Sequence, residues 1–528
     1  MTFLNFGIPF NIKYETGDAS VHYLTSRMFT EEDRLLIKVE DEIYGDFQGR
    51  KIGSYSNTGI IMECLSNVVS EIDCYKIFIA FDIFVLCMSG IMMYSTLEKF
   101  TKCNKSKLLA LAVSIIYVMG YPLNSLLFGF EYLSLGILVV CTILHMIYYF
   151  EKEELKFYFY LIIFALLNFG LFSSYYMFVP FTYSALWIYF CRRSHKQGTK
   201  ETKIKWITPF FPRKEDINSI LLISITLVVP FVLGFVYHLV PELYSIFYNG
   251  SVEKALDYSS YILSHSFKLD GYIYINYYSS IILFVPLTVY YIYKRIKTKE
   301  WNNFEILEFA GLIIFMIILF ICVKLEKVSE YFLMKNYFIL WLMVIYINFK
   351  SLIDIFDKDK RITGLIVGGY VFIVAINLIF INMPLNHDNV NESLWNVAEI
   401  FGVNKTMILE RPKDVTPEEI EVLKYAKDNL DFLYGDIEIL GEDEQTYWVY
   451  VLLRYVSYYD ELDEYGSLYG GQEKLFMKYK NAINRIGKVD YMIYFKRCEF
   501  YERAKDKLFE NAEVLYENDA GGIVRYMK

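Results

Sequence analysis

The sequence predicts an α-helical polytopic membrane protein, with about ten spans and a C-terminal extracytoplasmic α/β domain. Of its 528 residues, 55% are hydrophobic and only 21% are charged, whereas soluble chains are about 45–50% apolar and about 25% charged. The apolar residues form uncharged runs long enough to cross a hydrocarbon core of ~30 Å. Every second loop between these runs is basic, as cytoplasmic loops are. This pattern excludes an ordinary soluble enzyme and a coiled-coil rod.

Six runs predict single spans: 77–97, 218–240, 276–293, 304–323, 336–353 and 363–382. Two further runs, 108–150 and 157–191, are too long for one helix each. The first is interrupted at 120–124 by Gly-Tyr-Pro-Leu-Asn, and the second between Gly170 and Pro180. Glycine and proline at these places are typical of turns, so we expect each run to be a hairpin of two helices.

The basic loops fix the expected orientation. They follow 97, 191, 293 and 353, and they contain Lys99, Lys102, Lys105, Lys107, Arg192, Arg193, Lys196, Lys294, Arg295, Lys297, Lys358, Lys360 and Arg361. With these loops in the cytoplasm, residues 1–76 and the C-terminal domain, 383–528, lie outside a cell membrane that the chain crosses many times. Since 1–76 would then cross the membrane with no preceding span, we expect a first helix to be missing from this chain.

Charge is distributed unevenly along the chain. Residues 1–76 hold 12 acidic and 7 basic side chains, and residues 383–528 hold 28 acidic and 18 basic ones. The two parts expected outside therefore have net charges of −5 and −10. The membrane part, 77–382, has a net charge of +6, and the whole chain has −9. Nucleic acid requires clustered Lys and Arg, so we expect membrane lipids as partners and no nucleic acid.

The C-terminal domain reads as alternating helices and strands. Thr416-Pro417-Glu418-Glu419 is a capping box that predicts a helix to about Leu430. Strands are expected at 437–440, 489–495, 514–516 and 523–526, and helices at 444–459, 473–486 and 499–509. The pattern predicts a three-layer sandwich or a small open sheet. No phosphate-binding loop or nucleophile motif occurs in it, which favours a packing or acceptor-recognition module.

The segment 14–23 contains the most suggestive acidic motif. On a helix beginning near Gly17, Asp18 and His22 share one face. Asp18, with Glu15 beside it, is a candidate catalytic base. Together with His22 it is also a candidate site for a divalent cation, Mg²⁺ or Mn²⁺. The alternative is that Asp18 only caps a helix over 19–29.

Two further carboxylates are expected at the same level of the membrane. Asp82 lies inside the first clear span, where an ionisable group is costly and faces a partner or a cavity, and Glu131 begins a later span. With Asp18 they predict an acidic substrate-binding cluster, although Asp82 alone would also serve as a packing hydrogen bond. Glu305 and Glu308 are expected to be solvated near the cytoplasmic end of their span.

The loop before the span 336–353 contains two lysines that run against the positive-inside trend. Lys327 and Lys335 are expected at the outer boundary of the membrane. An ammonium group there is suited to binding a lipid phosphate or pyrophosphate. The alternative is that these lysines pair with Glu326 and Glu330 on a solvated turn.

This layout resembles the GT-C superfamily of membrane glycosyltransferases. The shared features are a carboxylate in the first extracytoplasmic segment, many spans and a soluble extracytoplasmic C-terminal domain. The resemblance implies that Asp18, or Glu15 next to it, acts as the base. It also implies a polyprenyl-phosphate-linked sugar as donor, with Lys335 or Lys327 on the phosphate, and a cell-envelope acceptor. The chain has no WWDYG-like motif, and the later loops have no second acidic motif.

Two other function classes fit the sequence. A transporter or flippase for lipid-linked or hydrophilic cargo would use broken helices around a central site, and the interruptions at 120–124 and 170–180 are candidates for such breaks. A non-catalytic scaffold for envelope assembly would use the C-terminal domain as its working part. Convergence of the acidic residues at one membrane face favours the enzyme.

Overall fold

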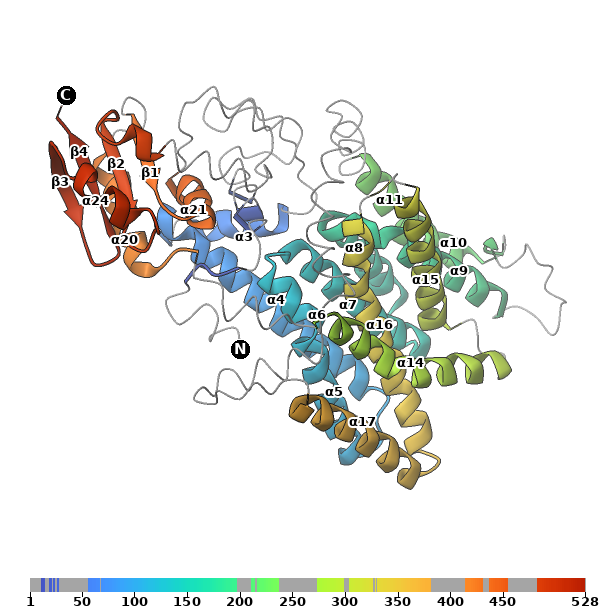
Figure 1. The fold of residues 1–528 in the computed structure, drawn as a ribbon. Helices are drawn as coiled ribbons and strands as arrows, with labels where there is room; N and C mark the ends of the chain where they lie inside the picture. The colour runs from blue at the N-terminus through green and yellow to red at the C-terminus, as the bar shows by residue number, and fades with distance from the viewer. Residues whose placement is uncertain are drawn as a thin grey trace.

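The computed structural model describes residues 11–14, 19–20, 22–23, 26–27, 56–66, 68–196, 210–213, 216–236, 273–298, 303–325, 328, 330–380, 414–430, 436–453 and 482–527. Helices dominate this part of the chain (Figure 1). Seven helical segments within it are long and apolar enough to cross a membrane: Glu71–Glu98, Asn104–Leu127, Glu131–Lys152, Phe157–His195, Ile217–Gly234, Phe304–Lys324 and Lys335–Phe356. The prediction of a helical membrane protein is therefore supported.

The long helices run up and down in a bundle. In chain order they are α4 (Cys74–Glu98), α5 (Asn104–Met119), α7 (Glu131–Lys152), α8 (Phe157–Tyr175), α9 (Val179–Lys196), α14 (Ile273–Lys297), α15 (Phe304–Lys324), α16 (Glu330–Phe356) and α17 (Lys360–Phe380). The C-terminal domain packs at the end of the bundle where α4 begins (Figure 1). We call this the domain end and the opposite end the far end.

The two long apolar runs fold as pairs of helices, but one turn is displaced from its predicted place. Gly120 only separates α5 from the short helix α6 (Tyr121–Leu127), and the chain turns at Phe128–Phe130 before α7 begins. In the second run, α8 and α9 form the expected hairpin. The rings of Phe164 and Phe190 lie 5.7 Å apart although 26 residues separate them, which requires α9 to run back along α8.

A π-helical turn interrupts one span at a proline. Helix α10 (Ile217–Ile223) passes through η4 (Ser224–Val228) into α11 (Val229–Gly234). Pro230 has no N–H to give to the carbonyl of Thr226 four residues earlier. The side chain of Asn168 in α8 donates to that carbonyl instead, at 2.8 Å. A neighbouring helix thus satisfies the backbone group that the proline leaves without its helical donor.

The C-terminal domain contains a four-stranded mixed sheet. Its strands are β1 (Ile437–Leu440), β2 (Tyr491–Phe495), β3 (Ala512–Glu517) and β4 (Gly521–Tyr526), in the order β1-β2-β4-β3, with only β1 and β2 parallel. Helices described in full beside it are α20 (Pro417–Asn429), α21 (Asp443–Leu453) and α24 (Tyr501–Leu508). Thr416 and Glu419 form the predicted capping box of α20. This fold matches the expected small open sheet and places all four expected strands.

The N-terminal residues lie between this domain and the bundle. Ile12 pairs with Val415 in an antiparallel bridge, and α3 (Ser56–Ser66) and the short helix η1 (Glu71–Asp73) precede α4. One apolar cluster joins Tyr14 and Tyr23 with Phe78 of α4 and Trp448 of α21. The domain is therefore built onto the bundle through the N-terminal segment.

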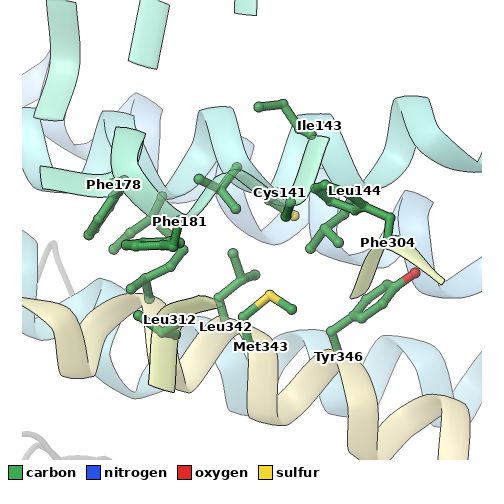
Figure 2. Close-up of a cluster of buried hydrophobic side chains, with 14 of the residues drawn as sticks. Cys141, Ile143, Leu144, Phe178, Phe181, Phe304, Leu312, Leu342, Met343 and Tyr346 are labelled. Atoms are coloured by element: carbon green, nitrogen blue, oxygen red, sulfur yellow. The ribbon is translucent and has the colours of Figure 1, made fainter. Parts of the chain in front are cut away.

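The middle of the bundle is packed with apolar side chains. Figure 2 shows Cys141 and Leu144 of α7 facing Leu342 and Met343 of α16, with Phe181 of α9 and Leu312 of α15 closing the layer. None of these six residues is more than 2% exposed. All eight cysteines are free thiols, so Cys64 and Cys74 form no disulfide.

Candidate functional site

Ionisable side chains from four parts of the chain meet at the domain end. They are His22 of the N-terminal segment, Asp82 of α4, Glu131 of α7 and Lys335 of α16, and each is at most 4% exposed. Sequence alone singles out all four, and the structure brings them together. We refer to these four residues as the domain-end cluster.

A tight turn presents Glu131 to this cluster. Gly129 adopts φ +73°, which disfavours any side chain, and Ala19 packs against its Cα. The amide of Phe130 donates to the carbonyl of Ser125, and the hydroxyl of Ser125 donates to the carbonyl of Phe130. Helix α7 starts directly after this turn. Glu131 therefore lies in its first turn, where the helix dipole favours a negative charge.

His22 is held by the same turn. Its Nδ1 lies 2.6 Å from the carbonyl oxygen of Gly129, which can only accept, so this nitrogen is protonated and donates. The same Nδ1 is 3.5 Å from Oε2 of Glu131, and the imidazole meets the ring of Tyr132 edge-on at 5.1 Å. Because Nδ1 is occupied, His22 would act on a ligand or a metal only through Nε2.

Lys335 lies among aromatic rings. Its ammonium donates to the hydroxyl of Tyr132. The nitrogen is 4.7 Å from the ring centroids of Phe130 and Tyr132 and 5.7 Å from that of Tyr175. Ring faces attract a desolvated cation. They hold the lysine next to Tyr132, the residue that follows Glu131, without neutralising its charge.

The carboxyl groups of Asp82 and Glu131 are close enough to interact electrostatically. The hydroxyl of Tyr14 lies 3.4 Å from Oδ2 of Asp82. Within the described part of the chain, Oδ1 of Asp82 and both side-chain oxygens of Glu131 are buried and accept no hydrogen bond. Buried polar atoms are normally hydrogen-bonded, so these three oxygens are suited to donors that a ligand would bring.

Three predicted site residues lie outside the described residues: Glu15, Asp18 and Lys327. Their nearest described neighbours do belong to the site region, since Tyr14 contacts Asp82 and Ala19 packs on Gly129. Among the described residues, no group of three or more His, Cys, Asp or Glu side chains is arranged to hold a metal ion. The cation site expected at Asp18 and His22 therefore stays a prediction.

A second set of buried charges lies at the far end, where solvated residues were expected. Glu305 is 4% exposed and Glu308 is fully buried, so the prediction of solvation is wrong for both. Oε1 of Glu305 accepts from Lys350 of α16 at 2.6 Å and from Tyr291 of α14 at 2.7 Å. Thr182 of α9 donates to Oε1 of Glu308 at 2.7 Å. Packing of α15 against α9, α14 and α16 buries this face, which no pattern of α15 alone reveals.

Sequence analysis also misses the aromatic part of the domain end. Tyr14 and Tyr132 each contact a residue of the cluster, and Trp448 stacks on Tyr14. Both tyrosines directly adjoin predicted acidic residues, Glu15 and Glu131. This neighbourhood is the one available signal, and it is weak in a chain with 48 tyrosines. Trp448 has no local signal, because its role depends on the docking of a distant domain.

No family model matches the sequence, and no curated protein is significantly similar to it.

Proposed function

We propose that this chain is a membrane glycosyltransferase that transfers a sugar from a polyprenyl-phosphate donor to an envelope acceptor. The observation that carries the proposal is the domain-end cluster. Asp82 and Glu131 are buried and have oxygens that accept no hydrogen bond from the described residues. Tyr132, the residue after Glu131, holds the ammonium of Lys335 through its hydroxyl and its ring. Carboxylates accept hydrogen bonds from sugar hydroxyls, ring faces stack on sugars, and an ammonium group binds phosphate.

The distribution of basic residues supports an extracytoplasmic position for this cluster. Many of the described basic residues flank the far ends of the helices, among them Lys99, Lys102, Arg193, Lys294, Arg295, Lys358 and Arg361. By the positive-inside rule the far end is cytoplasmic. The C-terminal domain and the domain-end cluster then lie on the outer side of a multi-pass cell-membrane protein.

In the proposed reaction the acceptor hydroxyl attacks the anomeric carbon of the donor. The new C–O bond forms as the bond from that carbon to the phosphate oxygen breaks, and the phosphate leaves with the electron pair. A carboxylate takes the hydroxyl proton. We assign this role to Glu131 or Asp82, and Asp18, with Glu15, stays the base that the superfamily resemblance implies. Lys335, and Lys327 with it, would stabilise the departing phosphate.

Transport is the weaker alternative. A carrier needs a path between the two ends, and the layer between them is packed with apolar side chains (Figure 2). A scaffold without activity would have little reason to retain buried carboxylates whose oxygens accept no hydrogen bond, because such groups destabilise the fold. The turnover assay described next tests the transferase against both the transporter and the scaffold.

The test is turnover by the purified full chain in lipid nanodiscs. The probes are undecaprenyl phosphates that carry a radiolabelled hexose or pentose, incubated with a cell-envelope extract, and the readout is release of free undecaprenyl phosphate. We expect Asp82→Asn and Glu131→Gln to lower turnover about 10²–10⁴-fold, the range for loss of an acid–base group. Asp18→Asn tests the base implied by the resemblance in the same assay.

Glu308→Gln is the matched control. It removes an equally buried carboxylate at the far end, and its amide oxygen can still accept from Thr182. The control should keep wild-type turnover. Full activity in both Asp82→Asn and Glu131→Gln would contradict the proposed site. Absence of turnover with every donor, from protein that remains folded, would contradict the proposed reaction.

A further inference from the structure

Tyr14 connects the C-terminal domain to the domain-end cluster. Its backbone N–H donates to Oδ2 of Asp414 at 3.1 Å. Its ring stacks on Trp448, with centroids 6.1 Å apart and planes 14° apart, and meets Phe78 of α4 edge-on. Its hydroxyl points to Oδ2 of Asp82 at 3.4 Å. One residue therefore contacts both the domain and the carboxylate.

The phenol can only donate in this position. Burial raises the pKa of Tyr14 well above its usual range, and the negative charges of Asp82 and Glu131 raise it further. Tyr14 is therefore protonated at any physiological pH. Its hydrogen bond fixes Oδ2 of Asp82 and leaves Oδ1 for another donor.

The domain is held by contacts that are separate from this hydrogen bond. Lys427 of α20 pairs with Glu71 at 2.6 Å, and Lys424 of α20 lies 3.3 Å from Asp73. These pairs are partly exposed, so their attraction alone adds little. Reversing the charge of Lys427 has a larger effect, because it also adds repulsion from Glu71. The apolar cluster around Trp448 also joins the domain to α4 and the N-terminal segment. Cys74 is buried within that cluster, at the first residue of α4.

We propose that Tyr14 is a positioning residue through which the docked C-terminal domain orients Asp82 for the reaction. This inference rests on the proposed function for its chemical consequence. Docking of the domain, through Asp414 and Trp448, sets the place of the Tyr14 ring. The ring sets the place of the hydroxyl, and the hydroxyl fixes the carboxylate. Undocking the domain should therefore lower activity through the position of Asp82.

Docking is measured first, without any assay of activity. The background replaces the four cysteines that are not buried, Cys64, Cys87, Cys103 and Cys322, by serine. Maleimide labelling of Cys74 then reports undocking, and labelling of Cys498, which is 2% exposed inside the domain, reports unfolding. We expect Lys427→Glu, which repels Glu71, to speed labelling of Cys74 at least tenfold and to leave Cys498 protected. Trp448→Ala serves as the second undocking variant.

Turnover then tests positioning. Tyr14→Phe keeps the ring and removes the hydroxyl, so we expect kcat to fall about 10- to 100-fold, as for loss of a hydrogen bond to a charged group, with KM for the donor unchanged. Tyr23→Phe is the matched control. Tyr23 also packs on Trp448 and Phe78, but its neighbouring charge is Arg27 rather than Asp82. Its loss of hydroxyl should leave kcat unchanged.

The double variant separates positioning from a general structural role. Lys427→Glu should lower kcat in the wild-type background and have no further effect in Tyr14→Phe, because both changes remove the same hydrogen bond. Additive losses, a normal kcat in Tyr14→Phe, or a protected Cys74 in both undocking variants would overturn the inference. If the wild type turns over no donor, the proposed function fails by itself. In that case the contact between Tyr14 and Asp82 is tested by stability alone. The melting temperatures of Tyr14→Phe, Asp82→Asn and the double variant are compared, and additive changes overturn the contact.

Discussion

The two ends of the bundle bury the same kinds of charge and treat them differently. Helix α7 places Glu131 at the domain end, and α16 places Lys335 there and Lys350 at the far end, about 22 Å away along the helix. At the far end Lys350 binds Glu305 directly, and the hydroxyl of Tyr291 donates a second hydrogen bond to the same carboxylate. At the domain end three oxygens of Asp82 and Glu131 accept no hydrogen bond from any described residue. Charges satisfied within the protein stabilise a fold, whereas open ones are suited to a ligand.

The first prediction concerns which end faces outward and has an all-or-none outcome. Cys64 and Cys103 are both exposed, and α4 alone separates them. Contact with Ser106 lowers the pKa of the Cys103 thiol, which makes it more reactive. On intact cells a membrane-impermeant maleimide should label Cys64 and spare Cys103 until the cells are permeabilised. Cys64→Ser and Cys103→Ser identify each signal, and labelling of Cys103 in intact cells would invert the assignment of the ends.

The second prediction concerns the far-end ion pair. Glu305→Gln leaves the Lys350 ammonium buried without its carboxylate, and we expect a loss of about 3–5 kcal/mol in the free energy of unfolding. Lys350→Met should cost a similar amount. The double variant should recover most of the loss, because it leaves no uncompensated charge. Denaturation in detergent micelles provides the measurement, and additive losses would show that the two residues act independently.

Alkaline pH should weaken the domain end in a defined window. Burial raises the pKa of Tyr23 from 10.0 to about 12. A pKa raised by folding contributes stability that is present below pH 10 and lost as the pH rises through about 12, by up to ~2.7 kcal/mol. Tyr23→Phe should therefore flatten the fall in melting temperature between pH 9 and pH 12. An equal fall in both proteins would show that Tyr23 does not cause the alkaline loss.

The smallest expected effect is a change in stability at the domain end, and it tests most directly how the two ends of the bundle differ. Asp82→Asn and Glu131→Gln each remove a buried carboxyl group whose oxygens accept no hydrogen bond. Without ligand the free energy of unfolding should therefore stay level or rise, by up to about 1 kcal/mol, and the melting temperature with it. The same variants lose turnover under the proposed function. A carboxylate that destabilises the resting protein and serves the reaction is typical of a functional site. A clear loss of stability in either variant would place that residue with Glu305 as a structural group.

Much of the fold follows from local sequence. The uncharged runs give the long helices, and Thr416 with Glu419 gives the start of α20. The sequence predicts the turn before α7 at the wrong place, because Gly120 and Pro122 are stronger turn signals than Gly129. Pro122 is instead accommodated at the start of α6, and Gly129 makes the turn.

The candidate site was predictable as a set of acids and a lysine at one membrane level. The partners of those residues were not, because they come from distant parts of the chain. His22 meets Gly129, and Lys335 meets Tyr132, across 107 and 203 residues respectively. No local periodicity encodes such contacts. The burial of Glu305 and Glu308 was missed for the same reason, since three other helices cover them.

The contact between Tyr14 and Asp414 also sets an order of events during synthesis. The two residues are 400 positions apart, and translation at about 5–20 residues per second separates their emergence by roughly 20–80 seconds. During that interval the acidic residues of the membrane part are already made, while the segment that orders Asp82 has no partner. Only a chain synthesised through its last domain can form the contacts of Tyr14 with Asp414 and Trp448.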